Sequence, residues 1–436
     1  MHDVAIVGAG AAGVATAYFL RGSGADVIVL EAGDDVGGRT LTVPVGGVPS
    51  STGALFVYRG TPAEELATEL GVETVAFCPD TYGIHVNGET VVDSDNERLI
   101  DRLPIPPPAR EQLRTFVRTS LDEYAQYTRA GRLTDDARAL SGHTLAERLR
   151  GLEPDAREII TRAIRGGSVA DPSRLSAQYA LRYFASYLAH EQHSRLYPVD
   201  GMQSIVRAMV GRLAPGTVRL HARVDRIVYD SASDSYALTV AGKPDPLRAR
   251  HVVVAVPAPI SRRIVADLPR WKDEALAVTE VPGATTLSVT ADVTGLPHVT
   301  RWAFITVTGR AFDAVINPQP APPHPTAGPP ATAQFVCYGN SAGYRPDLAA
   351  DPAATAAWVE DFLAVAPELR GRVLGAHLQT WEHCFAILTP ERAGAVPRLQ
   401  RSIGRLHFAG DHTSASAGTH GAYSEARRVA DLITGA

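Results

Sequence analysis

Cysteine and lysine are scarce in this chain of 436 residues. The three cysteines, Cys78, Cys337 and Cys384, are an odd number set far apart, which fits neither a disulfide framework nor a CxxC metal or redox site. We expect reduced thiols with mostly structural roles. Only Lys243 and Lys272 are lysines among the 42 basic residues, a bias typical of a GC-rich bacterial genome rather than of a functional site.

Long apolar runs and basic blocks are missing as well. No segment reaches the roughly 18 to 20 uninterrupted apolar residues of a spanning helix, so we expect no membrane span. The apolar run Val4 to Val7 follows the first methionine too closely for a signal peptide, which favours a cytoplasmic location. The net charge of -5 comes from 42 basic and 47 acidic residues spread along the chain. Without a basic block to bind phosphates, nucleic acid is not an expected partner.

The N-terminal residues 4–30 have the pattern of a βαβ unit. Residues 4–7 read as a buried parallel strand, Ala11 to Gly22 as an alanine-rich helix, and Asp26 to Leu30 as a second buried strand. The whole composition, 45% hydrophobic and 20% charged, is that of a globular protein large enough for two domains.

A glycine motif joins the first strand to the helix. Gly8, Gly10 and Gly13 form a GxGxxG, in which the glycines let backbone N–H groups approach a pyrophosphate. Glu31 ends the second strand, where a carboxylate can accept hydrogen bonds from a ribose diol and would repel the 2′-phosphate of NADP. These residues predict a dinucleotide that contains adenosine, with NAD and FAD both open.

The remaining chain divides by periodicity. A helix is expected at Pro62 to Leu70, a helical region from about Pro104 to Leu213, and β-branched strands in 217–256, 284–316 and 333–340. The proline-rich loop 317–330 is either a surface connection or a flap beside a substrate entrance.

Six further motifs extend over the whole chain: EAGDDVGGRT, STGALF, YPVDGMQSIVRAM, ARVDRIVYD, HVVVAVPAPI and RLHFAGDHTSASAGTHGAYSEARRVADLI. Together they resemble those of the FAD-dependent amine oxidase superfamily, the flavin-containing amine oxidoreductases, which are related to protoporphyrinogen oxidase and carotenoid desaturases. The resemblance implies an α/β fold in which a Rossmann-like FAD-binding domain, a doubly wound parallel sheet with the GxGxxG, is interleaved with an α+β substrate-binding domain. The expected segments are 1–85, 196–283 and 376–436 for FAD, and 86–195 and 284–375 for the substrate.

The resemblance also implies noncovalent FAD and a set of cofactor-binding residues. Arg39 would lie along the cofactor, Val224 would contact adenine through its backbone, and Asp411 would lie near the ribityl chain and pyrophosphate. We read Cys384 as a small buried hydrophobe rather than a covalent anchor. The full expected set is Gly8, Gly10, Ala12, Gly13, Glu31, Gly38, Arg39, Thr40, Gly53, Ala54, Val224, Gly410, Asp411, Gly421 and Ala422.

The substrate side is expected to carry Trp381 and Phe385 as aromatic walls and His420 as a group that moves protons or orients the substrate. Plain packing is the alternative role for both aromatics, and a structural histidine is the alternative for His420. Further candidates are His383, His412, Glu64, Arg182 and Tyr183, and the histidines have no metal-ligand spacing.

The activity implied by the resemblance is oxidation of a C–N bond in an amine or an amine derived from an amino acid. Hydride transfer to flavin N5 would give an imine, and oxygen or another electron acceptor would reoxidise the cofactor. Leu287 and Ser288 stand where many relatives place a lysine that assists reoxidation, and the short segment around Trp381 resembles that of desaturases.

Two alternatives therefore stay open. One is a C–C dehydrogenase, desaturase or isomerase of the protoporphyrinogen oxidase and carotenoid desaturase type, and the other is a binding protein on the same fold without turnover. A homodimer is also compatible with the sequence, which does not fix the oligomeric state.

Overall fold

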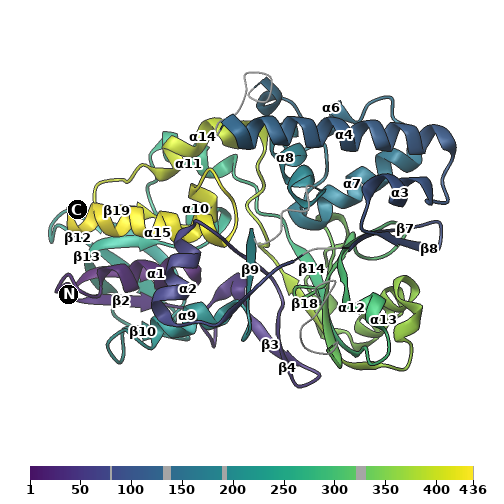
Figure 1. Ribbon diagram of the computed structural model, residues 1–436. Coiled ribbons are helices and arrows are strands. Elements are labelled where there is room, and N and C mark those ends of the chain that lie inside the picture. The colour runs from purple at the N-terminus through teal and green to yellow at the C-terminus, as the bar shows by residue number, and fades with distance from the viewer. Residues whose placement is uncertain (79–80, 131–138, 189–193, 321–329, 436) are drawn as a thin grey trace.

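Two seven-stranded sheets organise the chain in the computed structural model, which describes residues 1–78, 81–130, 139–188, 194–320 and 330–435. The side chains of residues 127–130, 182–183 and 185–188 also lie outside the described part. In Figure 1 the first sheet and both termini lie on the left, and the second sheet lies on the right beneath a layer of helices.

The first sheet has the order β10-β2-β1-β13-β12-β11, and β19 also pairs with β13. β10, β2, β1, β13 and β19 are joined by parallel pairs, whereas β12 pairs antiparallel with β13 and β11. Residues 4–7 and 252–254 are buried, as expected for parallel strands covered on both faces. The bounds are β1 His2–Val7, β2 Val27–Leu30, β10 Val218–Arg219, β11 Val224–Asp230, β12 Ser235–Val240, β13 Leu247–Val254 and β19 Leu406–Phe408.

The predicted βαβ unit is present with slightly shorter elements. Helix α1 spans Ala11–Leu20 and ends before the predicted Gly22, because the chain turns at Gly24, which has a φ of +78°. Strand β2 begins at Val27 rather than Asp26, and its parallel register with β1 begins with the pair Val4 and Val27.

The second sheet has the order β18-β14-β17-β16-β15-β7-β8 and is antiparallel except for the pair β15–β7. Its bounds are β7 Thr81–Val86, β8 Glu89–Asp93, β14 Ala284–Asp292, β15 Trp302–Val307, β16 Ala314–Ile316, β17 Thr332–Tyr338 and β18 Val373–Trp381. Two small sheets lie between the large ones: β3 Thr42–Val45 with β4 Val48–Ser51, and β5 Val57–Tyr58 with β9 Arg195–Pro198 and β6 Thr74–Ala76.

The helices cover the two sheets separately. Against the first sheet lie α1, α2 Pro62–Leu70, α9 Gln203–Val210, α10 Ala258–Ile264, α11 Arg270–Ala277, α14 Pro390–Gln400 and α15 Thr419–Thr434. With the second lie α3 Asn96–Asp101, α4 Pro107–Ala130, α6 Leu145–Arg148, α7 Pro154–Ser168, α8 Ala177–Leu188, α12 Pro297–Thr300 and α13 Pro352–Val365. The predicted helical region is interrupted by strand β9, which pairs with β5 and β6.

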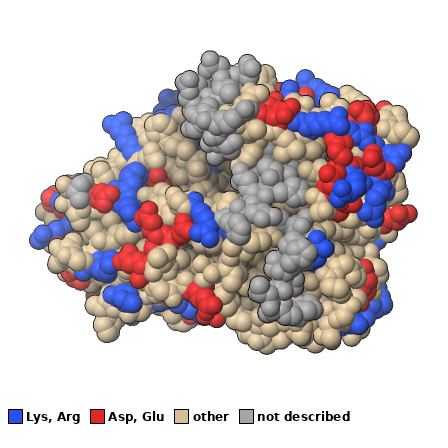
Figure 2. Space-filling view, viewed as in Figure 1, with Lys and Arg blue, Asp and Glu red and all other residues tan. Residues whose placement is uncertain are grey.

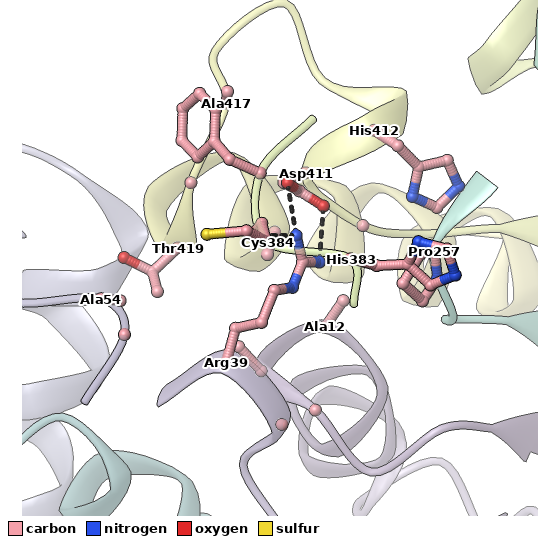
Figure 3. A pocket seen from close by; sticks show the side chains of 18 of the residues that line it. Ala12, Arg39, Ala54, Pro257, His383, Cys384, Asp411, His412, Ala417 and Thr419 are labelled. Atoms are coloured by element: carbon pink, nitrogen blue, oxygen red, sulfur yellow. Dashed lines mark hydrogen bonds and ion pairs between the residues drawn. The ribbon is translucent and has the colours of Figure 1, made fainter. Parts of the chain in front are cut away.

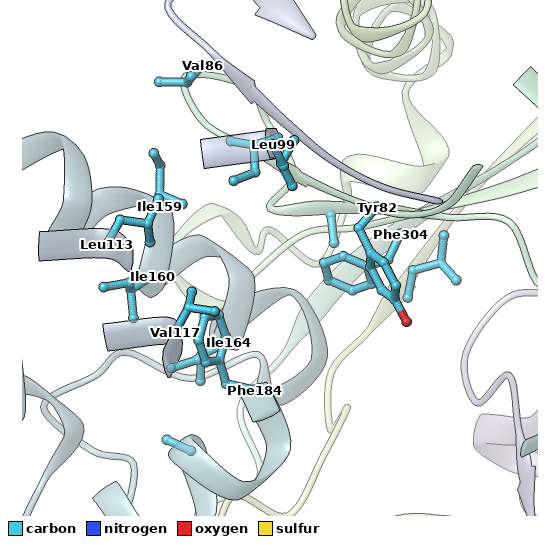
Figure 4. Close-up of a cluster of buried hydrophobic side chains, with 14 of the residues drawn as sticks. Tyr82, Val86, Leu99, Leu113, Val117, Ile159, Ile160, Ile164, Phe184 and Phe304 are labelled. Atoms are coloured by element: carbon cyan, nitrogen blue, oxygen red, sulfur yellow. The ribbon is translucent and has the colours of Figure 1, made fainter. Parts of the chain in front are cut away.

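A buried apolar cluster joins the helices to the second sheet. Figure 4 shows Leu113 and Val117 of α4 and Ile160 of α7 on the helical side, with Tyr82 of β7 and Phe304 of β15 from the strands. The apolar positions recur at intervals of three and four residues, so each helix turns one stripe toward the strands.

The predicted domain segments stay a prediction. Strands of the first sheet come from 2–30, 218–254 and 406–408, as that division requires. Its boundaries at residues 85 and 375, however, fall inside β7 and β18 of the second sheet. Most of the proline-rich loop, residues 321–329, lies outside the described residues, and with it the suggested flap.

Charges of both signs intermix on the face shown in Figure 2, most densely over α3 and α4 at the upper right. There Arg98 pairs with Asp93, and Arg114 and Arg118 pair with Glu97. Among the described helices, none combines the length and the apolar character that a membrane crossing requires.

Lys272 of α11 is buried, which is unusual for lysine. Its ammonium donates to the carbonyls of Arg398 and Leu399 at the end of α14 and lies 4.0 Å from the centre of the Phe408 ring. Burial, together with the charges of Arg428 and Arg401, lowers the pKa of Lys272 to about 7.

Replacing Lys272 with Met should change how stability depends on pH. An unfolded lysine has a pKa of about 10.4, so between about pH 7 and pH 10 the unfolded chain holds one proton more than the folded chain. The free energy of unfolding of the native protein should therefore rise, relative to K272M, by up to about 1.4 kcal/mol per pH unit in this window. Denaturant unfolding of both proteins at about pH 6 and about pH 9 measures the difference.

Lys243→Met is the matched control, because Lys243 is exposed in the turn after β12. Its unfolding curves should shift with pH in parallel with those of the native protein. Parallel behaviour of K272M as well would contradict the lowered pKa.

Candidate active site

One large cavity of about 1530 Å³ lies where the parallel strands of the first sheet end. Its lining includes Val7 at the end of β1, Leu30 at the end of β2 and Ala255 just after β13, and it continues to residues of α7 and β17. The carboxyl ends of parallel strands are where open α/β sheets bind ligands. The volume exceeds the roughly 300–1,000 Å³ of a typical small-molecule site, so the cavity has room for a large cofactor together with a substrate.

The glycine turn after β1 is shaped by close backbone packing. A Cβ on Gly13 would lie 1.8 Å from the carbonyl oxygen of Gly8, so α1 can approach the turn only with glycine there. Gly8 has a φ of +101°, a conformation that L side chains rarely adopt. Gly10 lines the cavity, and a Cβ there would meet only the Gly37 carbonyl at 3.9 Å, so its face is open toward a ligand.

Glu31 lies at the same end of the cavity, as its position after β2 predicts. One carboxylate oxygen accepts the N–H of Ala9 at 2.7 Å and the other accepts the N–H of Gly33 at 2.8 Å. These two bonds fix the carboxylate beside the glycine turn and leave further lone pairs for a ribose. Val224 lines this end too, next to Arg223 and Asp225.

Arg39 and Asp411 form a bidentate ion pair in the middle of the cavity wall (Figure 3). Nη1 and Nη2 of Arg39 donate to the two oxygens of Asp411 at 2.9 and 2.8 Å, and Nη1 also donates to the carbonyl of Cys384 at 3.1 Å. Burial alone would raise the pKa of the Asp411 carboxyl, but the charge and hydrogen bonds of Arg39 hold it well below its usual range. Sequence reasoning placed both residues at the cofactor and did not foresee that they pair with each other.

Arg392 was missed by the sequence analysis although it holds the C-terminal part of the site together. Its side chain is buried and donates to four carbonyl oxygens, those of Ala386, Ile387, Asp411 and Ser414. The only signal in the sequence was a helix start, since Thr389 caps α14 by accepting the N–H of Arg392.

The other expected cofactor residues divide into two groups. Gly13 and Gly421 do not line the cavity; a Cβ on Gly421 would lie 1.9 Å from the Ser416 carbonyl, so both glycines permit packing behind the wall. The members that line the cavity are Gly8, Gly10, Ala12, Glu31, Gly38, Arg39, Thr40, Gly53, Ala54, Val224, Gly410, Asp411 and Ala422. Their contacts with a cofactor stay a prediction.

Segment 51–53 lies at the end of β4 and is held by side chains of the second sheet. Thr286 of β14 and Trp381 of β18 both donate to the carbonyl of Thr52, at 2.5 and 3.1 Å. The hydroxyl of Tyr338 donates to the carbonyl of Gly53 at 2.6 Å. These three side chains line the cavity, so the bonds orient an aromatic wall beside the predicted flavin position.

Phe385 and His420 line the same end of the cavity. The His420 ring lies 5.1 Å from the ring of Tyr58, and the guanidinium carbon of Arg195 lies 5.5 Å from the centre of the same Tyr58 ring. Tyr58 and Arg195 are neighbours across the β5–β9 pair, which brings residues far apart in sequence together. Sequence reasoning missed both, because that pairing leaves no local signal.

Of the three polar candidates for the substrate side, Glu64 does not line the cavity, and the side chains of the other two lie outside the described residues. Glu64 is not in the cavity lining; it accepts hydrogen bonds from Arg59 and from the N–H of Gly60. The side chains of Arg182 and Tyr183 lie outside the described residues.

Two titratable groups in the cavity wall, His412 and Cys384, are kept in their neutral forms by burial. Burial lowers the pKa of His412 to about 4 and raises the pKa of the Cys384 thiol to about 12. His383 also lines the cavity, with Nδ1 3.3 Å from the Val281 carbonyl. Leu287 lies in the core, and Ser288 donates to the Ser51 carbonyl, so neither is among the described lining residues, and neither lysine is.

Together, the fold and the site define a two-sheet α/β protein with a ligand cavity at the ends of its parallel strands. Residues 11–434 match the family described as flavin containing amine oxidoreductase, and the chain belongs to that family. FAD is the cofactor that this membership gives the chain. The glycine turn, open at Gly10, and the size of the cavity fit such a group.

Known relatives include putrescine oxidase of Kocuria rosea, 30% identical over 293 residues that cover 62% of this chain and 59% of that protein. Hydroxyneurosporene desaturase of Rhodobacter capsulatus is 40% identical over 101 residues, 20% of each chain. The structure of cyclohexylamine oxidase from Brevibacterium oxydans IH-35A superposes with a TM-score of 0.75 at 21% identity, over 100% of this chain and 99% of that chain. The last likeness shows the fold, and the match to putrescine oxidase spans less than two thirds of that relative's length.

Replacing Arg39 with Met should destabilise the protein more than replacing Asp411 with Asn. R39M leaves the buried Asp411 carboxylate without its bidentate partner, whereas D411N removes the charge itself. Because 31% of the Arg39 side chain is exposed, we expect a loss of about 3 kcal/mol for R39M, near the lower end for a broken buried pair. Denaturant unfolding at matched FAD concentration measures the loss.

Arg262→Met serves as the control, since Arg262 forms a bidentate pair with Asp273 on the surface. That variant should lose less than about 1 kcal/mol. Equal losses in the free energy of unfolding for R39M and R262M would show that the Arg39–Asp411 pair stabilises the protein no more than a surface ion pair does.

Proposed function

We propose that this chain is an FAD-dependent oxidoreductase that oxidises the C–N bond of an amine. The observation that carries the proposal is a single cavity that joins the glycine turn at one end to an aromatic wall at the other. The family is described as flavin containing amine oxidoreductase, and relatives are named for putrescine and cyclohexylamine oxidation, which supports an amine as substrate.

We assign the end of the cavity beside β1 and β2 to the adenosine and pyrophosphate of FAD. Backbone N–H groups of the glycine turn and the N-terminus of α1 would face the pyrophosphate, where the helix dipole favours negative charge. Glu31 would accept from the ribose, and Arg39 and Gly410 would lie along the middle of the cofactor. The division into an FAD-binding and a substrate-binding domain belongs to this proposal.

Bound FAD supplies the acceptor for a hydride from the carbon beside the substrate nitrogen. The chain itself would position that carbon, keep water out and hold a neutral amine in place. Trp381, Phe385 and Tyr58 would form the walls, since aromatic rings exclude water and attract an amine or its cationic form. His420 is placed beside Tyr58 and would take the proton that an ammonium substrate must lose before it can react.

A carbon–carbon dehydrogenase or desaturase is the second candidate function. It is favoured by the desaturase relative and by the described cavity lining, which includes Thr286 on β14 and neither lysine of the chain. Such an enzyme would pass its electrons to an acceptor other than oxygen. A cytoplasmic location and a homodimer remain predictions of the sequence.

Anaerobic mixing of the purified, flavin-loaded protein with a panel of amines tests the proposal. We expect the visible flavin absorption to bleach with at least one amine, and hydrogen peroxide to appear once air is admitted. The panel should hold cyclohexylamine, putrescine, benzylamine and common amino acids. Bleaching without peroxide would assign a different acceptor. If no amine bleaches the flavin but a polyene or a reduced ring does, the second candidate function replaces the first.

Acid precipitation of the same protein tests how FAD is attached. Because burial keeps the Cys384 thiol protonated, with a pKa of about 12, we expect noncovalent FAD and a colourless pellet. Cys384→Ser should carry as much FAD as the native protein. A yellow native pellet that becomes colourless in C384S would identify this cysteine as a covalent anchor.

A further inference from the structure

Val169 has an uncommon backbone conformation in the wall of the cavity. It follows the last residue of α7 with a φ of +68°, the left-handed region that a β-branched residue rarely adopts. Its side chain is buried, and the residue lines the cavity with Gly166 and Gly167 of the same helix end. A strained residue in a ligand-facing position is more informative than one in a surface turn.

The surroundings leave Val169 little freedom to relax. Its N–H donates to the carbonyl of Arg165 at 2.8 Å, and its carbonyl accepts the N–H of Ser341 at 3.1 Å. The helix end is close against β16, because a Cβ on Gly166 would lie 2.6 Å from the Cβ of Ala314. The Val169 backbone is thus held by its own helix through Arg165 and by the segment after β17 through Ser341.

A fully buried carboxylate anchors this helix end from behind. Asp313 accepts hydrogen bonds from Nη1 of Arg162 at 2.6 Å and from Nε and Nη2 of Arg165 at 2.7 and 3.0 Å. The amide of Asn340 donates to the same carboxylate at 3.0 Å. The N–H of Asp313 donates to the carbonyl of Tyr338. Tyr338 is also one of the residues that line the cavity. One buried charge therefore connects the end of α7 to the end of β17.

We propose that Val169 is a specificity-determining residue that limits the bulk of the substrate, and that Asp313 positions it. The inference rests on the proposed amine oxidation. Ile316 and Tyr338 belong to the same part of the wall, so the substrate class that fits is an amine with an apolar body whose size is set by Val169. Glycine would suit the backbone better and would leave a gap there, so the valine serves the shape of the cavity.

Val169→Ala and Val169→Gly test this proposal in the FAD-loaded protein against primary amines of increasing bulk. We expect kcat/KM for the bulkiest accepted amine to rise about tenfold, the scale of one or two methyl groups in an apolar pocket, with the smallest amine changed less than about twofold. V169G should also keep or raise the midpoint of thermal unfolding, because it removes backbone strain. If Val169 had only a structural role, both variants would instead have a lower midpoint of thermal unfolding and a lower kcat/KM for all amines alike. That result would overturn the proposal.

Asp267→Gly is the matched control, since Asp267 has a φ of +55°, is exposed and is not among the residues that line the cavity. It should leave the ratio of rates for large and small amines unchanged. If the native protein oxidises no amine, the proposed function fails; if it does and the ratio is the same in V169A and V169G, only the inference fails.

Asp313→Asn tests the positioning role. Because Asp313 holds the end of α7 that carries Val169, the variant should loosen the limit on bulk and lower KM for bulky amines relative to small ones, while bound FAD and kcat for the smallest amine stay near the native values. Loss of FAD and of all activity in equal measure would show that Asp313 serves folding only.

Discussion

The ion pair between Arg39 and Asp411 joins parts of the chain that are 372 residues apart. Arg39 lies in the glycine-rich turn after β2, and Asp411 in the turn after β19, so the pair closes the cavity wall from both ends of the sequence. Arg392 adds bonds to the carbonyls around Asp411 and so brings the chain that precedes α14 into the same cluster. The buried Arg392, the partly exposed Arg39 and the buried Asp411 carboxylate cost desolvation, which good hydrogen-bond geometry repays. The shape of the cavity depends on that geometry.

The shape of the cavity also depends on segment 51–53, at the end of β4, whose carbonyl groups accept hydrogen bonds from side chains of the second sheet. Ser288, Thr286, Trp381 and Tyr338 all donate to these carbonyls, so the second sheet is tied to the main chain at the end of β4. For Trp381 the sequence left two roles open, plain packing and a substrate wall over the flavin, and the second stays a prediction. Trp381 packs and donates a hydrogen bond, and it also forms part of the cavity wall.

The two ends of the cavity differ in how far the sequence predicts them. At the β1–β2 end the constraints are steric and local: Gly13 is required by the carbonyl of Gly8 five residues earlier, and such a requirement leaves a motif. The elements of that end were predicted to within two residues. At the other end, Tyr58 meets Arg195 and His420 across strands and helices far apart in sequence. Contacts between distant residues produce no motif with a regular spacing in the sequence. Arg392 and Asp313 were missed for the same reason.

This difference has a functional meaning. The turn after β1 tolerates almost no change at Gly13, because an added Cβ would lie 1.8 Å from the Gly8 carbonyl oxygen. The wall around Val169, Ile316 and Tyr338 is held by buried polar networks that lie behind it and do not face the ligand. Side chains on that wall can change in size while Asp313 keeps the backbone in place. A fold built in this way can keep one cofactor while its substrate differs, which agrees with relatives named for amines as different as putrescine and cyclohexylamine.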